Sequence, residues 1–541
     1  MLGQRPRVGI FIDPQVRQDG IDLDALLVDL QLSGAVPVRV VPGLARHPDL
    51  LAGAAAAVGA RRAVVVTGGF ERALLGELRT WGAGAGLDPL GVQLVTLGIL
   101  RARRDAPERA AYAARLVRAA AAAADARDVS PSVRRSLGSA LTRRALLHGR
   151  ASTWVPVVDV VDRMCIGVLR CGRCVDACPG QALVVSADAP GGPPRVDAAR
   201  CGACSRCLDA CPAGALQLDG HDPEALARRI RALLRGGDGA SAPVLVISCE
   251  DAATAGHRAG QGGALPGWLT LEVACLGGIG SAWLLAAVAG GARAVRILPC
   301  ARCRDHAALA DAVDFARDLL AAFGDPSASD RVGVLPVGGA LLQRSVRSAG
   351  CLAPLVGGAA VDRPPSPVAA ESAAKGTARV AAWAVVELHQ ALGPGRQVPP
   401  GLAVRTLGPG SPLGLVSDLR PGCTACGVCA RTCPSGSLDL KVGGSGALLS
   451  FDAAACTGCG LCGDACPEDL LDVTRVVDPA TLARGRTVLA RVDMPTCRDC
   501  GAAIPVLPSA KRPPSPVSGL AGRCSGCRQT VLATSIGIPL R

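Results

Sequence analysis

The chain has 541 residues, more than one hydrophobic core supports, so we expect roughly three to five domains. Apolar residues make up 49% of the sequence, which excludes a largely disordered protein. The formal charge of +13 would suit an acidic partner. However, the arginines are dispersed and no basic run is interleaved with aromatic residues, which argues against nucleic-acid binding.

Residues 1–128 contain no cysteine and alternate strand-like with helix-like segments. Four apolar runs, "RVGIFI", "PVRVV", "RAVVVTGG" and "VQLVTLG", predict strands. A leucine pattern over residues 23–30 predicts one helix, and Pro107 predicts the first turn of another. Strands that alternate with helices indicate a parallel α/β sheet. No glycine-rich phosphate-binding motif follows a strand, so we assign no nucleotide site and no FAD site.

The sequence offers neither an export signal nor a convincing membrane span. The start "MLGQRPRVGIFIDP" turns polar again within a few residues. Residues 273–292 are uncharged, but five glycines and a cysteine favour a buried strand, loop and helix. We therefore expect a cytoplasmic protein without membrane insertion. Disulfides are not expected there, so CxxC spacings point to metal.

Cysteine content divides the rest of the chain. A connector leads into a cysteine-rich block, a linker helix and a second α/β unit. A Pro/Ala/Gly-rich linker with one helix then precedes a second cysteine-rich block and a small last module. The predicted boundaries are 129–155 for the connector, 156–220 for the first block, 221–242 for the linker helix, 243–348 for the α/β unit, 349–412 for the second linker, 413–475 for the second block and 485–541 for the last module.

The second block carries two complete iron–sulfur motifs in tandem. Each reads C-x2-C-x2-C-x3-C-P, which lets one tight loop hold three corners of a cubane cluster while the fourth cysteine turns toward the other cluster. This spacing favours clusters over packing or zinc. We assign one [4Fe–4S] cluster to Cys423, Cys426, Cys429 and Cys466, and another to Cys456, Cys459, Cys462 and Cys433.

The first block has the same pair of motifs with one insertion. Removing Val168–Arg170 from "CIGVLRCGRCVDACP" restores an ordinary ferredoxin loop, and lengthening a loop by three residues costs only about 1 kcal/mol of closure entropy. The alternative is that Cys165 packs as a small apolar side chain beside a three-ligand cluster. We assign one [4Fe–4S] cluster to Cys165, Cys171, Cys174 and Cys211, and another to Cys201, Cys204, Cys207 and Cys178.

The second α/β unit places cysteines at the ends of its predicted strands. "APVLVISC", "LTLEVAC" and "RAVRILPC" each end in a cysteine, and a fourth follows closely. The carboxyl ends of parallel strands share one sheet edge, where ligands bind. A single cysteine at a strand end is usually packing, but four in register favour ligation, and a [2Fe–2S] cluster suits them. The set is Cys249, Cys275, Cys300 and Cys303.

The last module contains two CxxC pairs, which resemble the two knuckles of a zinc ribbon. A zinc ion would fold a segment too small for its own core. Rubredoxin-type iron is the alternative, although the aromatic residues that usually surround such iron are absent. The predicted ligands are Cys497, Cys500, Cys524 and Cys527.

No catalytic residue is assigned. His306 follows Cys303 closely, but a surface position at the start of a helix explains it, and Cys351 stands alone. The sequence has no Ser–His–Asp set, no HExxH motif and no paired carboxylates in a recognisable frame. The predicted fold class is a multidomain protein that combines α/β and α+β parts. These are a parallel α/β N-terminal domain, two bacterial-type 2[4Fe–4S] ferredoxin domains, a second small parallel α/β domain and a zinc-ribbon-like module.

The order of these parts resembles known electron-transfer proteins. "RVGIFID", "IDLDALLVDL" and "RRAVVVTGGFERAL" resemble the N-terminal domain of the A-type, flavin-binding subunit of heterodisulfide reductase, and the first cysteine-rich block resembles its ferredoxin region. "VISCE", "EVACLGGI" and "GARAVRILPCARCR" resemble the delta (iron–sulfur) subunit of methyl-viologen-reducing hydrogenase. The delta subunit passes electrons from a hydrogenase or formate dehydrogenase to the flavin of the reductase.

The chain departs from those families at three points. Only about 30 residues stand where the flavin-binding subunit of the reductase has its flavin domain. The cysteine-bearing loops of the family's N-terminal domain appear here as "IDPQ" and "TGGF", so no cluster is expected there. Cys300 and Cys303 are closer in sequence than the family's last cysteine pair, which leaves the cluster type open but not the metal.

The resemblance implies an electron-transfer subunit without its own substrate site. Its expected partners are hydrogenase or formate dehydrogenase subunits and a heterodisulfide-reductase-like or other flavin oxidoreductase. Two alternatives stay open. One is a flavin-dependent bifurcating reductase subunit whose FAD is supplied by a partner, and the other is a redox-sensing scaffold.

Overall fold

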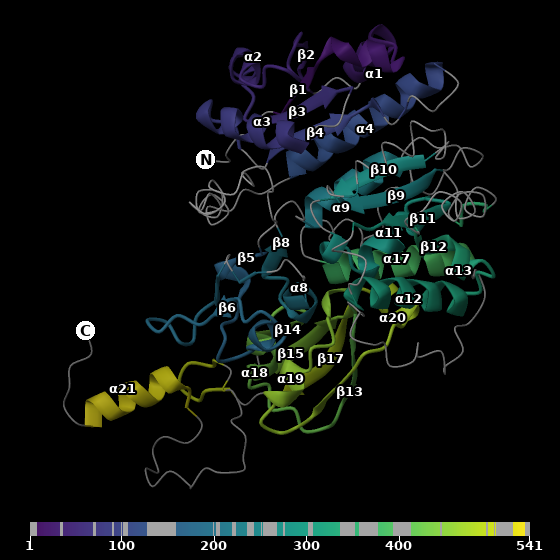
Figure 1. The fold of residues 1–541 in the computed structure, drawn as a ribbon. Coiled ribbons are helices and arrows are strands. Elements are labelled where there is room, and N and C mark those ends of the chain that lie inside the picture. Colours follow the sequence, from purple (N-terminus) through teal and green to yellow (C-terminus); the bar gives the residue numbers. More distant parts are fainter. Residues whose placement is uncertain are drawn as a thin grey trace. The chain divides into compact units, whose positions relative to one another are not determined.

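The chain forms two compact units, Met1–Pro412 and Leu413–Arg541. Figure 1 shows the fold of the computed structural model. The structure describes residues 8–32, 36–68, 72–88, 91–98, 100, 106–126, 158–197, 200–201, 206–218, 223–234, 243–249, 252, 268–273, 276–300, 307–335, 352–355, 377–392, 413–443, 446–493, 496–502, 504 and 523–535.

The N-terminal domain is built on a four-stranded parallel sheet, as the sequence predicts. Each strand coincides with one of the four predicted apolar runs, and the order across the sheet is β2-β1-β3-β4. The strands are β1 (Val8–Ile12), β2 (Val38–Val40), β3 (Arg62–Thr67) and β4 (Val92–Thr96).

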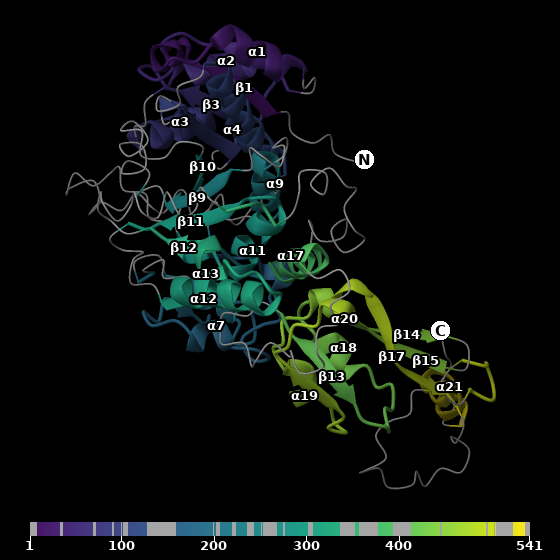
Figure 2. The same ribbon diagram turned by 90° about the vertical axis from the view of Figure 1, so that its right-hand side faces the viewer.

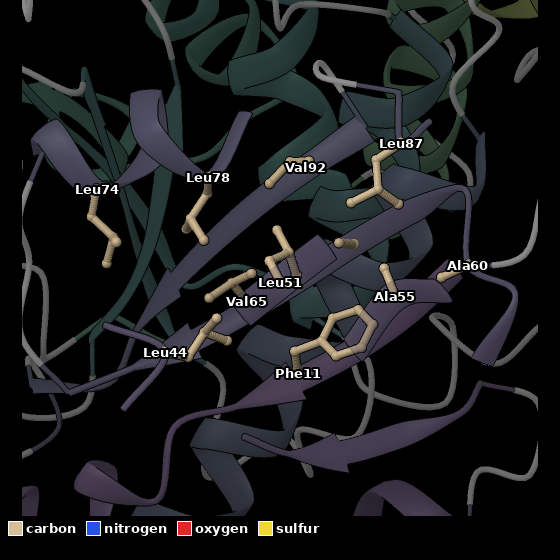
Figure 3. Close-up of a cluster of buried hydrophobic side chains, with 11 residues drawn as sticks. Phe11, Leu44, Leu51, Ala55, Ala60, Val65, Leu74, Leu78, Leu87 and Val92 are labelled. Carbon is tan, nitrogen blue, oxygen red and sulfur yellow. The ribbon is translucent and has the colours of Figure 1, made fainter. Parts of the chain in front are cut away.

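Helices cover both faces of this sheet. Figure 3 shows Phe11 and Val65 of the sheet packed against Leu51 of α2 (Leu50–Val58) and Leu78 of α3 (Arg72–Gly84). Side chains alternate along a strand, so the residues next to Phe11 and Val65 point to the other face of the sheet. On that face pack α1 (Leu23–Leu32) and α4 (Ala106–Ala126), with the short helix η1 (Pro14–Asp19) after β1.

A second parallel sheet has the same strand order as the first. Its order is β10-β9-β11-β12. The chain therefore adds β10 on one side of β9, and β11 and β12 on the other side, so the strand order reverses between β9 and β11. Its strands are β9 (Val244–Cys249), β10 (Trp268–Val273), β11 (Ala294–Leu298) and β12 (Val332–Val334). Its helices are η6 (Leu276–Gly278), α11 (Ser281–Ala289), α12 (Ala307–Ala322) and α13 (Ala328–Arg331).

Two helices from the predicted linkers pack onto these α/β domains. All nine residues of α11 are buried, and an apolar helix of this kind needs cover on every side. Helix α17 (Thr377–Leu392) packs along α11, while α9 (Pro223–Leu234) contacts both α11 and α4. Arg228 of α9 lies 3.4 Å from Asp125 at the end of α4. Both linker helices are therefore part of the packed structure.

The first cysteine-rich block consists of short antiparallel pairs and single-turn helices. Strand β5 (Val158–Val160) pairs with β8 (Leu216–Leu218), so the two ends of the block meet. Between them lie η4 (Asp162–Met164), α7 (Arg173–Asp176), the pair β6 (Leu183–Val184) and β7 (Arg195–Val196), and α8 (Arg206–Ala210).

The second cysteine-rich block repeats this plan and adds a sheet. Strand β13 (Leu415–Leu419) pairs with β16 (Leu471–Thr474), as β5 does with β8. The short helices are α18 (Val428–Thr432), η7 (Ala453–Ala455), α19 (Leu461–Asp464) and α20 (Pro479–Ala483). The added antiparallel sheet has the order β14-β15-β17, from β14 (Leu438–Gly443), β15 (Gly446–Asp452) and β17 (Arg486–Asp493).

Strand β17 corrects one predicted boundary. The sequence places residues 485–541 in a separate last module, but β17 pairs along its length with β15 (Figure 2). Backbone hydrogen bonds to β15 satisfy the polar groups of β17, so this segment belongs to the second block. Within the described residues, the last module then comprises the loop around Cys497 and helix α21 (Ser525–Ser535).

Among the described residues, no helix is both long and apolar enough to cross a membrane. The uncharged stretch at residues 273–292 contains the end of β10, η6 and α11, as the sequence predicts.

Candidate metal centres

The cysteine loops share one backbone device. In three of them a glycine between the second and third cysteine has a left-handed conformation: Gly172 at φ 62°, Gly427 at φ 71° and Gly460 at φ 80°. Only glycine adopts this conformation at little cost. The short helices α7, α18 and α19 begin at the next residue. The turn therefore places the third cysteine in a helical turn directly after the loop.

In the first block, four thiols surround one hollow. The other walls of the hollow are mostly apolar, including Ile166, Val168 and Ala215. Burial raises the pKa of the Cys174 thiol to about 11, and the neighbouring thiols Cys211, Cys165 and Cys171 contribute to the increase. The four cysteines are Cys165, Cys171, Cys174 and Cys211, the set that the motif spacing groups together.

The three-residue insertion lies at the edge of this hollow. The carbonyl oxygen of Gly167 accepts hydrogen bonds from the N–H groups of Arg170 (3.3 Å) and Cys171 (3.2 Å), so Val168–Arg170 form a compact turn. Cys165 lies within the thiol group, and its Sγ accepts a hydrogen bond from the N–H of Gly167 at 3.4 Å. The inserted Leu169 is 79% exposed.

In the second block, another four thiols surround a second hollow. Leu440, Leu449 and Leu471 contribute to its walls, and Glu468 is the acidic residue among them. Burial raises the pKa of Cys429 to about 12. The four cysteines are Cys423, Cys426, Cys429 and Cys466, again the set that the spacing groups.

A third group of thiols lies close together in the second block. Burial raises the pKa of Cys456 to about 12, and the nearby thiols of Cys433, Cys459 and Cys462 contribute to the increase. The pKa of Cys462 is raised to about 11 by burial and by Cys433 and Cys459. Charge effects of this kind act at short range, so these four thiols lie near one another.

The remaining predicted set is only partly described. Cys178 and Cys201 are half-buried and Cys207 is buried, while Cys204 lies outside the described residues. The N–H of Ala182 donates to Sγ of Cys178 at 3.2 Å, as the N–H of Ala215 does to Sγ of Cys211 at 3.3 Å.

Two serines outside the cysteine motifs contact a predicted ligand. The hydroxyl of Ser437 lies 3.1 Å from Sγ of Cys433, and that of Ser435 lies 3.6 Å from it. Burial raises the pKa of Cys433, but hydrogen bonds from Ser437, from the N–H of Leu438 and from Ser435 outweigh it, so the pKa is lowered. The signal in the sequence is "CPSGS", where the other three turns have no serine.

The second α/β sheet brings two of the predicted strand-end cysteines, Cys249 and Cys300, to one edge. Cys249 pairs with Val273, two residues before Cys275, and Ser248 pairs with Leu298, two residues before Cys300. Cys249 is buried and Cys300 is half-buried. The parallel register thus places Cys249 and Cys300 at the same edge, whereas Cys275, Cys303 and the neighbouring His306 lie outside the described residues.

In the last module, Cys497, Cys500, Cys524 and Cys527 have their sulfurs within 4.8 Å of one another. Gly501, at φ 70°, turns the first knuckle, and its N–H donates to the carbonyl oxygen of Cys497 at 2.8 Å. The N–H of Cys524 lowers the pKa of Cys497, and an ion pair between Arg523 and Asp499 links the two knuckles. The distances suit four ligands around one ion.

The donor sets fit soft metals. Each group consists of thiols alone, which select zinc and iron–sulfur clusters rather than magnesium or calcium. Two of the three groups in the cysteine-rich blocks line hollows with mostly apolar walls. That arrangement fits clusters bound by thiolates away from water.

Two segments of the chain, residues 164–221 and 422–470, match the profile of the family described as the 4Fe-4S dicluster domain. Both segments are 4Fe–4S dicluster domains. They coincide with the two cysteine-rich blocks and mark the chain as an iron–sulfur electron-transfer protein. The two ferredoxin domains of the predicted fold class are thereby confirmed, as are the parallel sheets.

No curated protein matches the chain. The resemblances to the flavin-binding subunit of heterodisulfide reductase and to the hydrogenase delta subunit therefore stay predictions. So do the individual ligand assignments within the two dicluster domains, the [2Fe–2S] cluster and the zinc ion.

Proposed function

We propose that this protein relays electrons between a hydrogenase or formate dehydrogenase and a heterodisulfide-reductase-like or other flavin oxidoreductase. Two dicluster domains in one chain carry the proposal, because one such domain is enough for a simple ferredoxin. Substrate conversion would take place in partner subunits.

Four cubane clusters and one [2Fe–2S] cluster would supply one-electron transfer steps. The residues that would hold the first two cubanes are Cys165, Cys171, Cys174 and Cys211, and Cys178, Cys201, Cys204 and Cys207. Those for the other two are Cys423, Cys426, Cys429 and Cys466, and Cys433, Cys456, Cys459 and Cys462. Cys249, Cys275, Cys300 and Cys303 would hold the [2Fe–2S] cluster, and Cys497, Cys500, Cys524 and Cys527 a zinc ion.

The chain itself supplies three things to these sites. Where the thiols are described, it groups them, it surrounds two of the groups with mostly apolar walls, and it donates backbone N–H groups such as that of Ala215 to the sulfurs. The hydrogen bonds and the restricted access of water are the means by which a protein sets cluster potential.

Metal analysis of protein purified without oxygen tests the proposal. Four cubanes and one [2Fe–2S] cluster predict about 18 irons per chain, and fewer than about 12 would contradict the four-cubane assignment. Replacing Cys426 by serine should reduce the iron content, while replacing the lone Cys351 should not. An EPR-monitored titration should show reversible reduction in the range of ferredoxins.

Flavin content and redox behaviour separate the alternatives. Near-stoichiometric FAD after purification would favour the bifurcating reductase subunit. Clusters that cannot be reduced reversibly would favour the redox-sensing scaffold. Isolation of the tagged chain from its native cells, without oxygen, should recover hydrogenase or formate dehydrogenase subunits together with a flavin oxidoreductase if the relay is right.

A further inference from the structure

The four Cys-Pro turns of the two dicluster domains have the same backbone. In each turn the N–H three residues after the cysteine donates to the cysteine carbonyl oxygen, at 3.1 to 3.4 Å. The residue that carries this N–H has a positive φ in every case. These residues are Gln181 at 47°, Gly214 at 61°, Gly436 at 65° and Asp469 at 50°. The turns are therefore four copies of one scaffold.

The side chains on this scaffold differ at the second and fourth positions after the cysteine. The turn of Cys178 has Gly180 and Ala182 there, and the turn of Cys211 has Ala213 and Ala215. The turn of Cys466 has Glu468 and Leu470. Hydroxyl groups occur in one turn alone, that of Cys433, as Ser435 and Ser437.

Both hydroxyls reach the sulfur of Cys433, at 3.6 Å for Ser435 and 3.1 Å for Ser437. A sulfur that binds iron has lost its proton and can only accept, so both hydroxyls must donate to it. Ser437 is 2% exposed, so water competes little for its hydroxyl. Hydrogen bonds to a charged acceptor in such surroundings are stronger than hydrogen bonds between neutral groups.

We propose that Ser435 and Ser437 raise the reduction potential of the cluster held by Cys433, which makes it the electron-accepting member of the second dicluster domain. Reduction adds one electron and one negative charge to the cluster and its four thiolates. A donated hydrogen bond stabilises the more negative state more, which favours reduction.

At the neighbouring site in the same domain, a side chain lowers the reduction potential instead of raising it. Glu468 lines the hollow of Cys423, Cys426, Cys429 and Cys466, where a carboxylate disfavours an added electron. Ser435 and Glu468 occupy the same position in their turns, and they shift the reduction potentials of the two clusters in opposite directions. This inference rests on the proposed cluster binding and adds an order of potentials to it.

The test compares redox titrations of the full chain, purified without oxygen, in the wild type and in S435A/S437A. We expect the equilibrium constant for one-electron reduction of one cluster to fall about tenfold, a shift of about 59 mV to more negative potential, with the other couples unchanged. S450A is the matched control, because Ser450 is buried in the same domain and its hydroxyl donates to the carbonyl of Asp439.

A gain-of-function variant guards against simple misfolding. A213S/A215S places two hydroxyls on the Cys211 turn, and it should raise the potential of the cluster held by Cys165, Cys171, Cys174 and Cys211. If both double variants keep their iron and no couple moves, the inference is wrong. If the wild type lacks the iron for four cubanes, the proposed function itself fails, and iron analysis separates the two outcomes.

Discussion

The N–H of Val168 donates to the carbonyl oxygen of Gly192 at 3.1 Å, which joins the insertion in the first cysteine loop to the connection between β6 and β7. A side chain at Gly167 would collide with the carbonyl oxygen of Gly191 on the same connection. The insertion is therefore a fixed part of the wall beside Cys165 and Cys171. We infer that packing holds it in place and that it does not interrupt the site.

Deleting Val168–Arg170 should change the potential of the nearby cluster without removing it. The deletion removes none of the four cysteines. It changes which backbone N–H groups face the sulfurs and how far this edge of the cluster is exposed to solvent. An EPR titration of the deletion variant measures the shift, and its iron content measures occupancy. An unchanged titration would contradict the prediction, and L169A, which keeps the backbone turn, serves as the control.

Cluster assembly should become more favourable as the pH rises from 7 toward 9. The pKa of Cys174 is raised to about 11 and those of Cys429 and Cys456 to about 12, so these thiols carry protons in the apo protein. Protons and iron compete for the same sulfur, and each thiol that binds releases a proton. We expect resistance to an iron chelator to increase at least about tenfold per pH unit in this range. A resistance to the chelator that decreases as the pH rises would contradict the prediction.

Replacing Cys249 by serine should remove about two irons per chain and leave the cubane signals intact. Cys249 ends β9 beside the reversal of strand order, and Cys300 follows the adjacent β11. Ligands bind at such carboxyl edges of parallel sheets. Iron analysis and EPR of C249S, with C351S as the control, check this. A loss of cubane iron instead would mean that the variant disturbs the fold.

Replacing Cys500 by serine should release the zinc ion and leave the iron content unchanged. Among the described residues of the module, Cys497 is buried, but Cys500 is exposed and Cys524 and Cys527 are only half-buried. Without metal, helix α21 should become sensitive to protease. Zinc analysis and limited proteolysis measure both effects. If the wild-type protein instead shows iron with rubredoxin-type absorbance, the metal of this module is iron and the zinc assignment is wrong.

Replacing Phe11 by alanine should destabilise the N-terminal domain by about 3–5 kcal/mol. Its ring is fully buried between the sheet and α2 and α3 (Figure 3). No cysteine lies in this domain, so cluster content at low temperature should not change. Thermal unfolding and iron analysis together test both parts. V28A is the matched control, because Val28 is 57% exposed.

Much of the fold follows from local signals. The four strands of the N-terminal domain match the predicted runs because β-branched and apolar residues favour buried strands wherever they occur in succession. The grouping of thiols such as Cys423 and Cys466 agrees with the spacing rule, since a short loop with a left-handed glycine restricts where its cysteines can lie. The buried face of α9, with Leu226 and Ile230, also follows from periodicity alone.

The sequence by itself therefore determined the strands of the N-terminal domain, the grouping of thiols such as Cys423 and Cys466, and the two dicluster domains, because each depends on residues close together in the chain. Only the tertiary structure decided that β17 joins β15, that α17 covers α11 and that Val168 is hydrogen-bonded to Gly192. These pairings depend on which distant surfaces bury each other best, a sum over many weak contacts that no short motif encodes. The two hydroxyls near Cys433 belong to both levels. Their serines are visible in "CPSGS", but their approach to the sulfur depends on the turn that Gly436 closes in the folded chain.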